Sequence, residues 1–317
     1  MSELPAGWSV RRPTIDDVPE ILELTHASDV AAVGAPDFTA DEVHAALTAP
    51  HTDMSRDCWL VADAGGTIVG WAYPNNPGGG PRDFVEVYVW PRRGVPALRP
   101  LLALALARVA ERGREFGHET YAVRAGAIPT ETAWIAALTG AGFAFVKRHA
   151  RMIMALDGVD RVPPAPPPGV TIRPLRAGDD AEMRTFHAVI EEAFRDSDHR
   201  ATDFATWQVV AGAESSVSYD EWFVAEVDAR IAGVLQSSDS CLDDNEGWVR
   251  YLAVLRPYRR RGVGEALMRR AFATYAAKGR AHAGLGVDLA NPTRAARLYR
   301  AVGMHPRYAA NIYERSA

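Results

Sequence analysis

Three arginines followed by two glycines form the segment of this sequence best suited to hold an anion. The run Arg259-Arg260-Arg261-Gly262-Val263-Gly264 follows an apolar stretch that ends near Val254 and a turn at Arg256-Pro257. Glycines at the start of a helix let several backbone N–H groups approach a phosphate closely, and the helix dipole and the guanidinium groups add attraction. The pattern predicts a phosphate or pyrophosphate site. By itself it is a weak signal, because an arginine run is also typical of a solvated surface.

A dinucleotide-binding fold is the first alternative for such a loop. Asp288 ends the next expected strand about where a ribose-binding acid falls in that fold. The glycine fingerprint, however, begins directly after its strand, whereas the stretch LRPYRRR intervenes here from Leu255 onward. Its third glycine would also fall at Leu267. The sequence therefore disfavours this fold.

The elements that must position the loop are a mixture of strands and helices. Apolar residues have helical spacing through 181–194, and Asn291-Pro292 has the N-cap and first-turn residues of a further helix. Asp228-Ala229 lies between two apolar runs and predicts a tight hairpin. We expect strands at 170–175, 222–227, 230–235, 248–254 and 283–289, and helices at 181–194, 262–278 and 291–302. This mixture predicts an α/β or α+β mixed sheet covered by helices.

The two halves of the chain resemble each other. DCWLVADAGGTIVGW (57–71) aligns with DEWFVAEVDARIAGV (220–234), and Arg12-Pro13 aligns with Arg173-Pro174, roughly 160 positions later. A proline-rich stretch between the halves favours an extended backbone and predicts a semi-rigid linker. We therefore expect a first domain at 1–157, a linker at 158–169 and a second domain at 170–317. A chance similarity between two α/β domains is the alternative.

The composition excludes several classes of function. The 317 residues are enough for two domains, and the net charge of −5 argues against a protein that coats nucleic acid. The first residues show no secretion signal, and the longest apolar run, 101–107, is too short to cross a membrane. Cys58 and Cys241 have no metal or disulfide spacing, and the histidines form no ligand pattern. These features predict a cytoplasmic protein without a metal.

The arginine–glycine loop and its surroundings resemble the signature of the GNAT superfamily of N-acetyltransferases. The family pattern is Arg or Gln, two residues, Gly, one residue and then Gly or Ala, which Arg259, Gly262 and Gly264 match. The family also has Ala-x-x-Leu-Tyr before a Gly-Phe-like pair further on. The matching residues here are Ala295, Leu298, Tyr299 and Gly303-Met304, with Met304 in place of the usual aromatic. The resemblance implies two tandem domains, each with a central twisted mixed sheet flanked by helices.

The resemblance also implies an activity and assigns residues to it. An enzyme of this family transfers acetyl from acetyl-CoA to a primary amine by direct attack in a ternary complex. Tyr299 would lie near the thioester sulfur, where a phenol with an ordinary pKa of about 10 can protonate the departing thiolate. A core aromatic on a helix is the alternative interpretation of Tyr299. The cofactor-binding residues implied are Leu252, Ala253 and Val254 for the pantetheine arm, 259–264 for the pyrophosphate, and Asn291 for the arm.

A general base is also needed, because an alkylammonium of pKa about 10.4 has no free lone pair. Relatives in the family use a carboxylate at the start of the central strand, often through water, and Glu246 is the nearest candidate. It lies two residues before Trp248 and shares its face if the strand extends back that far. Asp243 and Asp244 are rivals, and a plain polar loop is the alternative. The acidic residues that would attract a cationic acceptor also include Asp196 and Asp198.

The first half carries a degenerate version of the same pattern. Its loop is shorter, and Pro96 replaces the second glycine and so removes one N–H group. Thr130 and Leu138 stand in the places of Asn291 and Tyr299. We therefore expect catalysis in the second half alone. Residual CoA binding by the first half stays open, through Arg92 and Arg93.

The tandem layout resembles the mycothiol synthase group of actinobacterial GNAT proteins, but no residue identifies the acceptor. The partner we expect is a small-molecule or peptide amine, with no nucleic acid and no membrane; the sequence predicts no oligomeric state. A non-catalytic CoA-binding or regulatory protein with the inherited fold is the main alternative. Nucleic-acid binding through the arginine loop is disfavoured, because no aromatic platform accompanies it.

Overall fold

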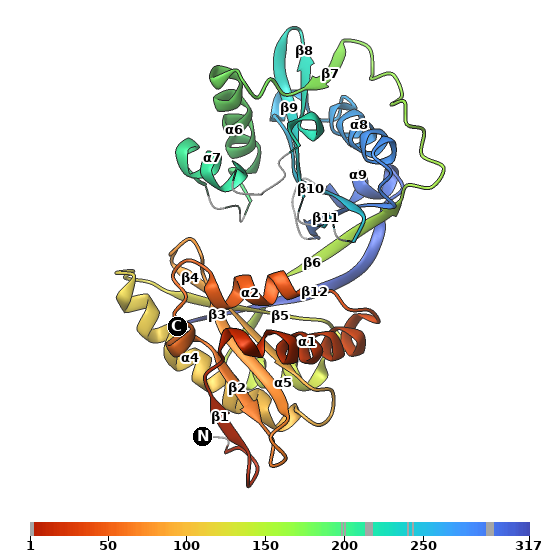
Figure 1. Ribbon diagram of the computed structural model, residues 1–317. Helices are drawn as coiled ribbons and strands as arrows, with labels where there is room; N and C mark the ends of the chain where they lie inside the picture. The colour runs from red at the N-terminus through yellow and green to blue at the C-terminus, as the bar shows by residue number, and fades with distance from the viewer. Residues whose placement is uncertain are drawn as a thin grey trace. The chain divides into compact units, whose positions relative to one another are not determined.

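The computed structural model describes residues 3–197, 199, 201–212, 218–239, 241–242, 244–289 and 295–317. The chain forms two compact units, which we call unit 1 (Met1–Arg148 with Tyr308–Ala317) and unit 2 (His149–Arg307) (Figure 1). Each unit has strands, helices and a buried apolar cluster of its own. None of the helices described is both long and apolar enough to span a membrane.

Unit 2 is built on a mixed sheet with one parallel pair of strands, β10 and β11. The other neighbouring pairs are antiparallel. The turn between β8 and β9 is the predicted hairpin: Asp228 and Ala229 have φ of 51° and 57°, as a type I′ turn requires. The strand order is β6 (Ala144–Ala155, from residue 149 onward), β11 (His282–Asp288), β10 (Glu246–Val254), β9 (Arg230–Ser238), β8 (Phe223–Val227) and β7 (Val170–Pro174).

Helices cover both faces of this sheet. On one face, α6 (Asp180–Phe194) and α7 (Phe204–Gly212) pack through Phe186 and Trp207 onto a cluster that includes Ala253 of β10. On the other face lies α8 (Val263–Ala277), whose Tyr275 ring fills the space beside Gly247; a Cβ at Gly247 would lie 2.4 Å from that ring. A short helix, α9 (Ala295–Ala301), follows β11. The predicted elements of this half are confirmed, and the expected start of the last helix at 291–294 lies outside the described residues.

A β-bulge in β10 decides which of its side chains face which helices. The pairing of β10 with β9 is irregular at Arg250. Before the bulge, Glu246 faces the side of α6 and α7, since the residue after it faces α8. After the bulge the alternation is shifted, so that Ala253 faces α6 while Leu252 and Val254 face α8.

Unit 1 repeats the architecture of unit 2, as the internal similarity of the sequence predicts. Its sheet again has one parallel pair, β4 with β5. The helix α4 (Leu98–Glu115) covers one face, and α1 (Val18–Val33) packs through Ile21 and Leu24 on the other. The strand order is β1 (Ser9–Arg11), β2 (Trp59–Ala62), β3 (Ile68–Asn75), β4 (Arg82–Val89), β5 (Ala122–Ala127) and the end of β12 (His305–Ser316). The remaining helices are α2 (Ala40–Thr48), α3 (Met54–Asp57) and α5 (Thr132–Gly140).

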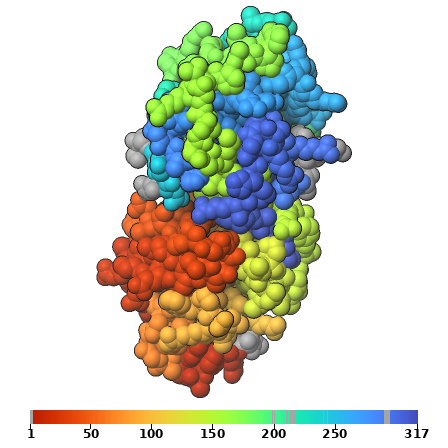
Figure 2. All heavy atoms as spheres, turned by 90° about the vertical axis from the view of Figure 1, so that its right-hand side faces the viewer, coloured from red at the N-terminus to blue at the C-terminus, as the bar shows by residue number. Residues whose placement is uncertain are grey.

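The boundaries of the units differ from the predicted domain limits of 157 and 170. Residues 149–155, from before the linker, pair with β11 and belong to unit 2. Residues 311–316, from the end of the chain, pair with β5 and belong to unit 1. The physical reason is that a closing strand belongs to the sheet with which it hydrogen-bonds, and local sequence does not encode that partner. Residues 158–169 contain no helix or strand, as expected of a linker, and Figure 2 shows them (yellow-green) along the surface of unit 2.

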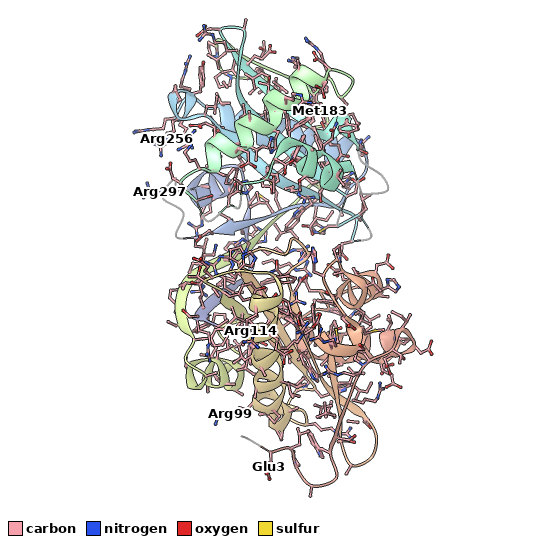
Figure 3. The ribbon with its side chains drawn as sticks, turned by 90° about the vertical axis from the view of Figure 1, so that its left-hand side faces the viewer. Glu3, Arg99, Arg114, Met183, Arg256 and Arg297 are labelled. Carbon is pink, nitrogen blue, oxygen red and sulfur yellow. The ribbon has the colours of Figure 1, made fainter. Side chains whose placement is uncertain are left out.

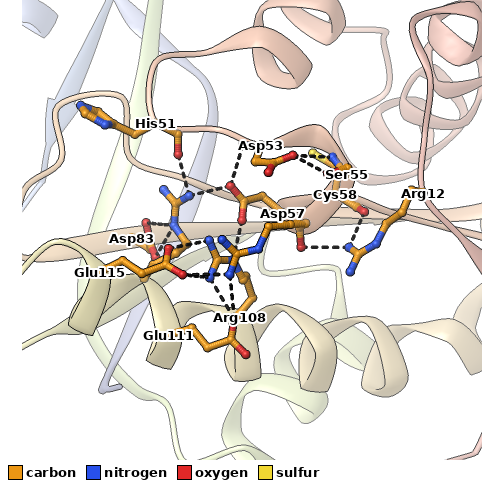
Figure 4. Close-up of polar contacts among 12 residues, drawn as sticks. Arg12, His51, Asp53, Ser55, Asp57, Cys58, Asp83, Arg108, Glu111 and Glu115 are labelled. Carbon is orange, nitrogen blue, oxygen red and sulfur yellow. Dashed lines mark hydrogen bonds and ion pairs between the residues drawn. The ribbon is translucent and has the colours of Figure 1, made fainter.

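A buried charge network lies under α4 in unit 1 (Figure 4). Arg108 and Arg112 both donate to Asp57, over 2.6 and 2.8 Å, and Arg112 also contacts Asp83 at 3.1 Å. Arg108 continues to the more exposed Glu115 and lowers the pKa of that carboxyl to about 2. Since these charges compensate one another, removing one partner would leave a buried charge unpaired. The network anchors α4 to the segment before β2.

Candidate functional site

The N-terminus of α8 presents free backbone donors. Arg260 and Gly262 have φ of 63° and 77°, a left-handed conformation that turns the chain into the helix at Val263. The first N–H group bonded within the helix is that of Ala266, which donates to the Gly262 carbonyl over 3.0 Å. The N–H groups before it have no intrahelical acceptor, and the N-cap residue Gly262 has no side chain to cap them. Together with the helix dipole, they form a site suited to an anion.

The three arginines of the loop do different things. Arg259 turns inward: its Nε donates to the Val254 carbonyl over 3.0 Å and its Nη2 to the Ala193 carbonyl over 3.1 Å. Its side chain therefore holds the loop in place, which differs from the predicted direct role toward a pyrophosphate. Partial burial lowers the pKa of Arg259, but an arginine of this kind stays charged. Arg260 and Arg261 are exposed, and neither forms an ion pair within the part of the chain that the structure describes.

Other basic residues surround the loop. Arg256, in the turn before the loop, forms an ion pair with Asp196. The sequence predicted that Asp196 attracts a cationic acceptor, whereas in the structure it pairs with this arginine. Arg297 of α9 is exposed. Figure 3 shows Arg256 and Arg297 pointing away from the body of unit 2 on the same side of the view. Asp198 lies outside the described residues.

The edge of β10 is released from β11 next to this loop. The parallel pairing runs from Glu246 to Val249 and stops there. Farther along, the N–H of Leu255 donates to Ala232 on the β9 side, so by alternation the N–H and C=O of Leu252 and Val254 point to the opposite side. Of these four groups, the Val254 carbonyl accepts from Arg259. No described strand pairs with Leu252 or Val254 on that side, which leaves donors and acceptors available to an extended ligand.

Gly264 is the point at which the loop, the strand and α9 meet. A Cβ there would lie 3.0 Å from Cδ2 of Leu298 and 3.6 Å from Cγ2 of Val254, with Leu252 next at 3.9 Å. The glycine therefore allows α8 to begin against both elements. Leu298 directly precedes Tyr299, so α9 brings this tyrosine to the same region of unit 2.

Tyr299 is buried, with 8% of its surface exposed. Burial raises the pKa of its phenol to about 12, so it is neutral at pH 7 and a hydrogen-bond donor. Asn291, the other residue expected on this side of the site, lies outside the described residues.

Glu246 is a buried carboxylate at the start of β10, which begins early enough to include it. Its exposure is 2%, and its Oε2 accepts from Nη2 of Arg151 over 3.2 Å. Its Oε1 is buried without a hydrogen-bond partner in the described structure. This oxygen lies over Gly284 of β11, where a Cβ would be 1.7 Å away. The carboxylate thus occupies space that only glycine leaves open.

A cavity of about 500 Å³ opens beside Glu246. Asp244, a predicted rival base, also lines it but is exposed, whereas Asp243 lies outside the described residues. The other lining residues are Ile153, Ala155, His282, His305 and Arg307. The described residues contain no group of histidines, cysteines and carboxylates that could hold a metal ion.

Sequence reasoning missed Arg151 and Gly284. Arg151 lies before the linker, and its guanidinium stacks 5.0 Å from the Trp248 ring while it bonds Glu246. No local signal connects it with a residue almost a hundred positions away. The isolated Gly284 inside an apolar strand is a signal for close approach, and it was available from the sequence.

The equivalent region of unit 1 keeps a left-handed arginine, Arg92 with φ of 62°, but differs at other points. Gly94 has φ of −84° and lies in a short turn with Pro96, and Arg93 is paired with Asp63. Leu138, in the place of Tyr299, is fully buried in the apolar core. The pairing of β3 with β4 shows no bulge. Unit 1 therefore lacks the left-handed glycine, the phenol and the bulged strand of unit 2.

Comparison with known proteins places these features in a family context. Residues 218–304 match the model of the acetyltransferase (GNAT) domain. A GCN5-related N-acetyltransferase structure from Sphaerobacter thermophilus is 26% identical, with a TM-score of 0.85 over 99% of this chain and 97% of that one. A tandem GNAT protein from the clavulanic acid biosynthesis pathway is 20% identical, with a TM-score of 0.69 over 98% of both chains. The curated proteins contain no match.

A more distant likeness concerns the fold alone. N-myristoyltransferase of Saccharomyces cerevisiae, solved with myristoyl-CoA, is 11% identical, with a TM-score of 0.59 over 98% of this chain and 79% of that one. The predicted tandem GNAT fold is confirmed, and residues 218–304 in the second half match the GNAT acetyltransferase domain model. The resemblance to mycothiol synthase stays a prediction.

Proposed function

We propose that unit 2 transfers an acetyl group from acetyl-CoA to a primary amine in a ternary complex. The observation that carries the proposal is the meeting of three elements at Gly264: an uncapped helix start, a strand edge released from its neighbour, and the helix of Tyr299. An anion site alone would suit many ligands. An anion site beside an open strand edge suits a pyrophosphate that carries an amide-rich arm.

The binding role of each group follows from its chemistry. The free N–H groups at the start of α8 would hold the pyrophosphate, with Arg260 and Arg261 as counter-charges. The backbone groups of Leu252 and Val254 would hydrogen-bond the amides of the pantetheine arm, in the manner of an added strand. We carry over to Asn291 the family role of binding the same arm.

The chemical step needs a proton acceptor and a stabiliser of the leaving group. The amine nitrogen attacks the thioester carbonyl and forms the new C–N bond, and its proton passes to the free Oε1 of Glu246, directly or through a water. The C–S bond then breaks and the electron pair stays on sulfur. The Tyr299 phenol donates a hydrogen bond to that thiolate.

The raised pKa of Tyr299 limits what this phenol does. Complete transfer of the proton from a phenol of pKa about 12 to the thiolate is uphill by about 5 kcal/mol if the thiol formed has a pKa of about 8.5. We therefore assign Tyr299 to hydrogen-bond stabilisation of the thiolate, with the final proton coming from solvent. In this proposal Tyr299 donates a hydrogen bond to the thiolate but does not transfer its proton.

The activity belongs to unit 2 in this proposal, because the corresponding loop of unit 1 is altered. In unit 1 the helix after the corresponding loop begins behind a proline-containing turn, and the nearest arginine is neutralised by Asp63. The proline removes one N–H group and the ion pair removes one counter-charge, and both changes weaken the attraction for a pyrophosphate.

The test is titration calorimetry of the full chain with acetyl-CoA, followed by mass spectrometry of an amine panel. We expect micromolar-class binding, which Arg261→Glu weakens at least tenfold. The matched control is Arg230→Glu, at an exposed arginine that begins β9. Binding of NAD in place of acetyl-CoA, or equal effects of the two variants, would refute the proposed site. Acetyl-CoA binding without transfer to any amine would instead support the alternative, a CoA-binding regulatory protein.

A further inference from the structure

Strand β11 has two glycines where the sheet of unit 2 holds Glu246. Gly284 pairs with Trp248 of β10, and Gly286, two residues farther along, pairs with Arg151 of β6. Because β11 lies between these two strands, side chains of β6 and β10 start about 10 Å apart. Without side chains at Gly284 and Gly286, this face of β11 is open, so that long side chains from both neighbouring strands can meet across it.

The side chain that crosses β11 from β6 is that of Arg151. Its Nη2 donates to Oε2 of Glu246 over 3.2 Å, and its guanidinium carbon lies 5.0 Å from the centre of the Trp248 ring. Both charged side chains are removed from solvent, since 13% of the arginine side chain and 2% of the glutamate side chain are exposed. A buried carboxylate is costly unless a cation compensates it. Among the described residues, the cation that pairs with Glu246 is Arg151.

This pairing gives the two oxygens of Glu246 different surroundings. Oε2 accepts from Arg151, whereas Oε1 has no hydrogen-bond partner among the described residues and lies over Gly284. A carboxylate that is held by a guanidinium through one oxygen has little freedom to rotate, so its other oxygen keeps a fixed direction. The free oxygen belongs to the side chain that lines the cavity of about 500 Å³.

We propose that Arg151 is a positioning residue for Glu246: it compensates the buried charge and keeps the free oxygen directed for the acceptor amine. This inference rests on the proposed function, in which Glu246 is the proton acceptor. Arg151 lies before the linker and outside residues 218–304, which match the GNAT domain model. The first half of the chain therefore completes the proton-accepting site of the second half.

The first test is a kinetic double-mutant cycle on the full chain, with acetyl-CoA and the panel amine that wild type acetylates fastest. Arg151→Met should lower kcat at least tenfold and leave the KM for acetyl-CoA within twofold. Arg151→Lys keeps the positive charge and should be at least threefold faster than Arg151→Met. In the Glu246→Gln background, Arg151→Met should change the residual rate less than twofold, because the arginine acts through the carboxylate. The matched control is Arg148→Met, at an exposed arginine of the same strand, with a rate within twofold of wild type.

The second test needs no acceptor amine. Arg151→Met leaves a buried carboxylate without its cation and should lower the melting temperature of the chain. The double variant Arg151→Met with Glu246→Gln removes that unpaired charge and should regain at least half of the loss. Scanning calorimetry of these variants and of Arg148→Met measures the effect and shows whether each variant is folded.

The outcomes separate this inference from the proposed function. A folded wild-type chain that acetylates no amine refutes the proposed function, and the inference falls with it. If wild type is active, the inference alone is overturned when Arg151→Met is as fast as Arg148→Met, or when its loss persists in the Glu246→Gln background. A melting temperature that Glu246→Gln does not restore also overturns it, because Arg151 would then not compensate this carboxylate.

Discussion

Replacing Glu86 by Gln should stabilise unit 1 at alkaline pH. Glu86 lies on β4, and partial burial raises its folded-state pKa from 4.5 to about 7, so the folded unit binds more protons than the unfolded chain between these values. Stability contributed by this group therefore falls as pH rises from 4.5 to 7, and the loss is complete above pH 7. A glutamine carries no charge, so the loss of stability with rising pH disappears. Its side-chain oxygen can still accept the hydrogen bond from the Tyr88 hydroxyl.

The magnitude follows from the pKa difference. A carboxyl with this shift destabilises the folded state by about 3 kcal/mol at pH 8 and by almost nothing at pH 4.5. Because Glu86 is partly exposed, solvent screens the effect, and we expect about half of it. For a domain of this size that is a rise in melting temperature of about 3–6 °C.

The assay is differential scanning calorimetry of wild type, Glu86→Gln and the control Glu23→Gln, at an exposed carboxylate of α1, at pH 4.5, 6 and 8. The expected pattern is a gain for Glu86→Gln that grows with pH and no gain for Glu23→Gln. A variant less stable than wild type at pH 8 would refute the reasoning, and so would a gain of equal size at every pH.

Three further predictions concern the transferase site and the architecture. Gly284→Ala should lower the rate of acetyl transfer at least tenfold, because its Cβ would lie 1.7 Å from Oε1 of Glu246, while the affinity for acetyl-CoA stays within twofold. Steady-state kinetics measures the rate and calorimetry the affinity. An unchanged rate would show that Glu246 takes no part in the mechanism. A fragment of residues 170–317 should aggregate, because β11 loses its partner strand 149–155. A fragment of residues 145–307 keeps that strand and should stay monodisperse in size-exclusion chromatography. Equal behaviour of the two fragments would contradict the observed boundary. Asp57→Asn should lower the unfolding free energy of unit 1 by about 3 kcal/mol in urea titration, because it leaves two buried arginines without this carboxylate. Glu111→Gln removes a more exposed partner and should cost less than about 1 kcal/mol. Similar values for the two variants would contradict the buried network.

Much of unit 2 was predictable because its signals are local. The hairpin at Asp228-Ala229, the helix that begins after Gly262 and the strand that ends at Val254 each depend on residues within a few positions. The backbone conformations that each residue type favours likewise depend only on residues a few positions away in the sequence. The role of Arg259 was less predictable: the motif identified the residue, but only the fold showed its guanidinium bonded to two backbone carbonyls.

Other features depend on contacts between distant parts of the chain. Strand order determined that Arg151 meets Glu246, and that Gly284 leaves room for the carboxylate between them. The surroundings of Glu86 likewise depend on the pairing of β3 with β4, which places Tyr73 opposite it.

The sequence by itself determined that this chain is a duplicated α/β protein, that its second half has an arginine–glycine loop with the GNAT pattern, and that the matching loop of its first half is altered. Those properties reside in periodicity, turn chemistry and short motifs, which act over neighbouring residues. Only the tertiary structure decided which strand closes each sheet, which arginine bonds the candidate base, and which carboxylates are buried. Pairing, burial and electrostatic neighbourhood are properties of the assembled fold, because each depends on groups that the chain brings together from far apart.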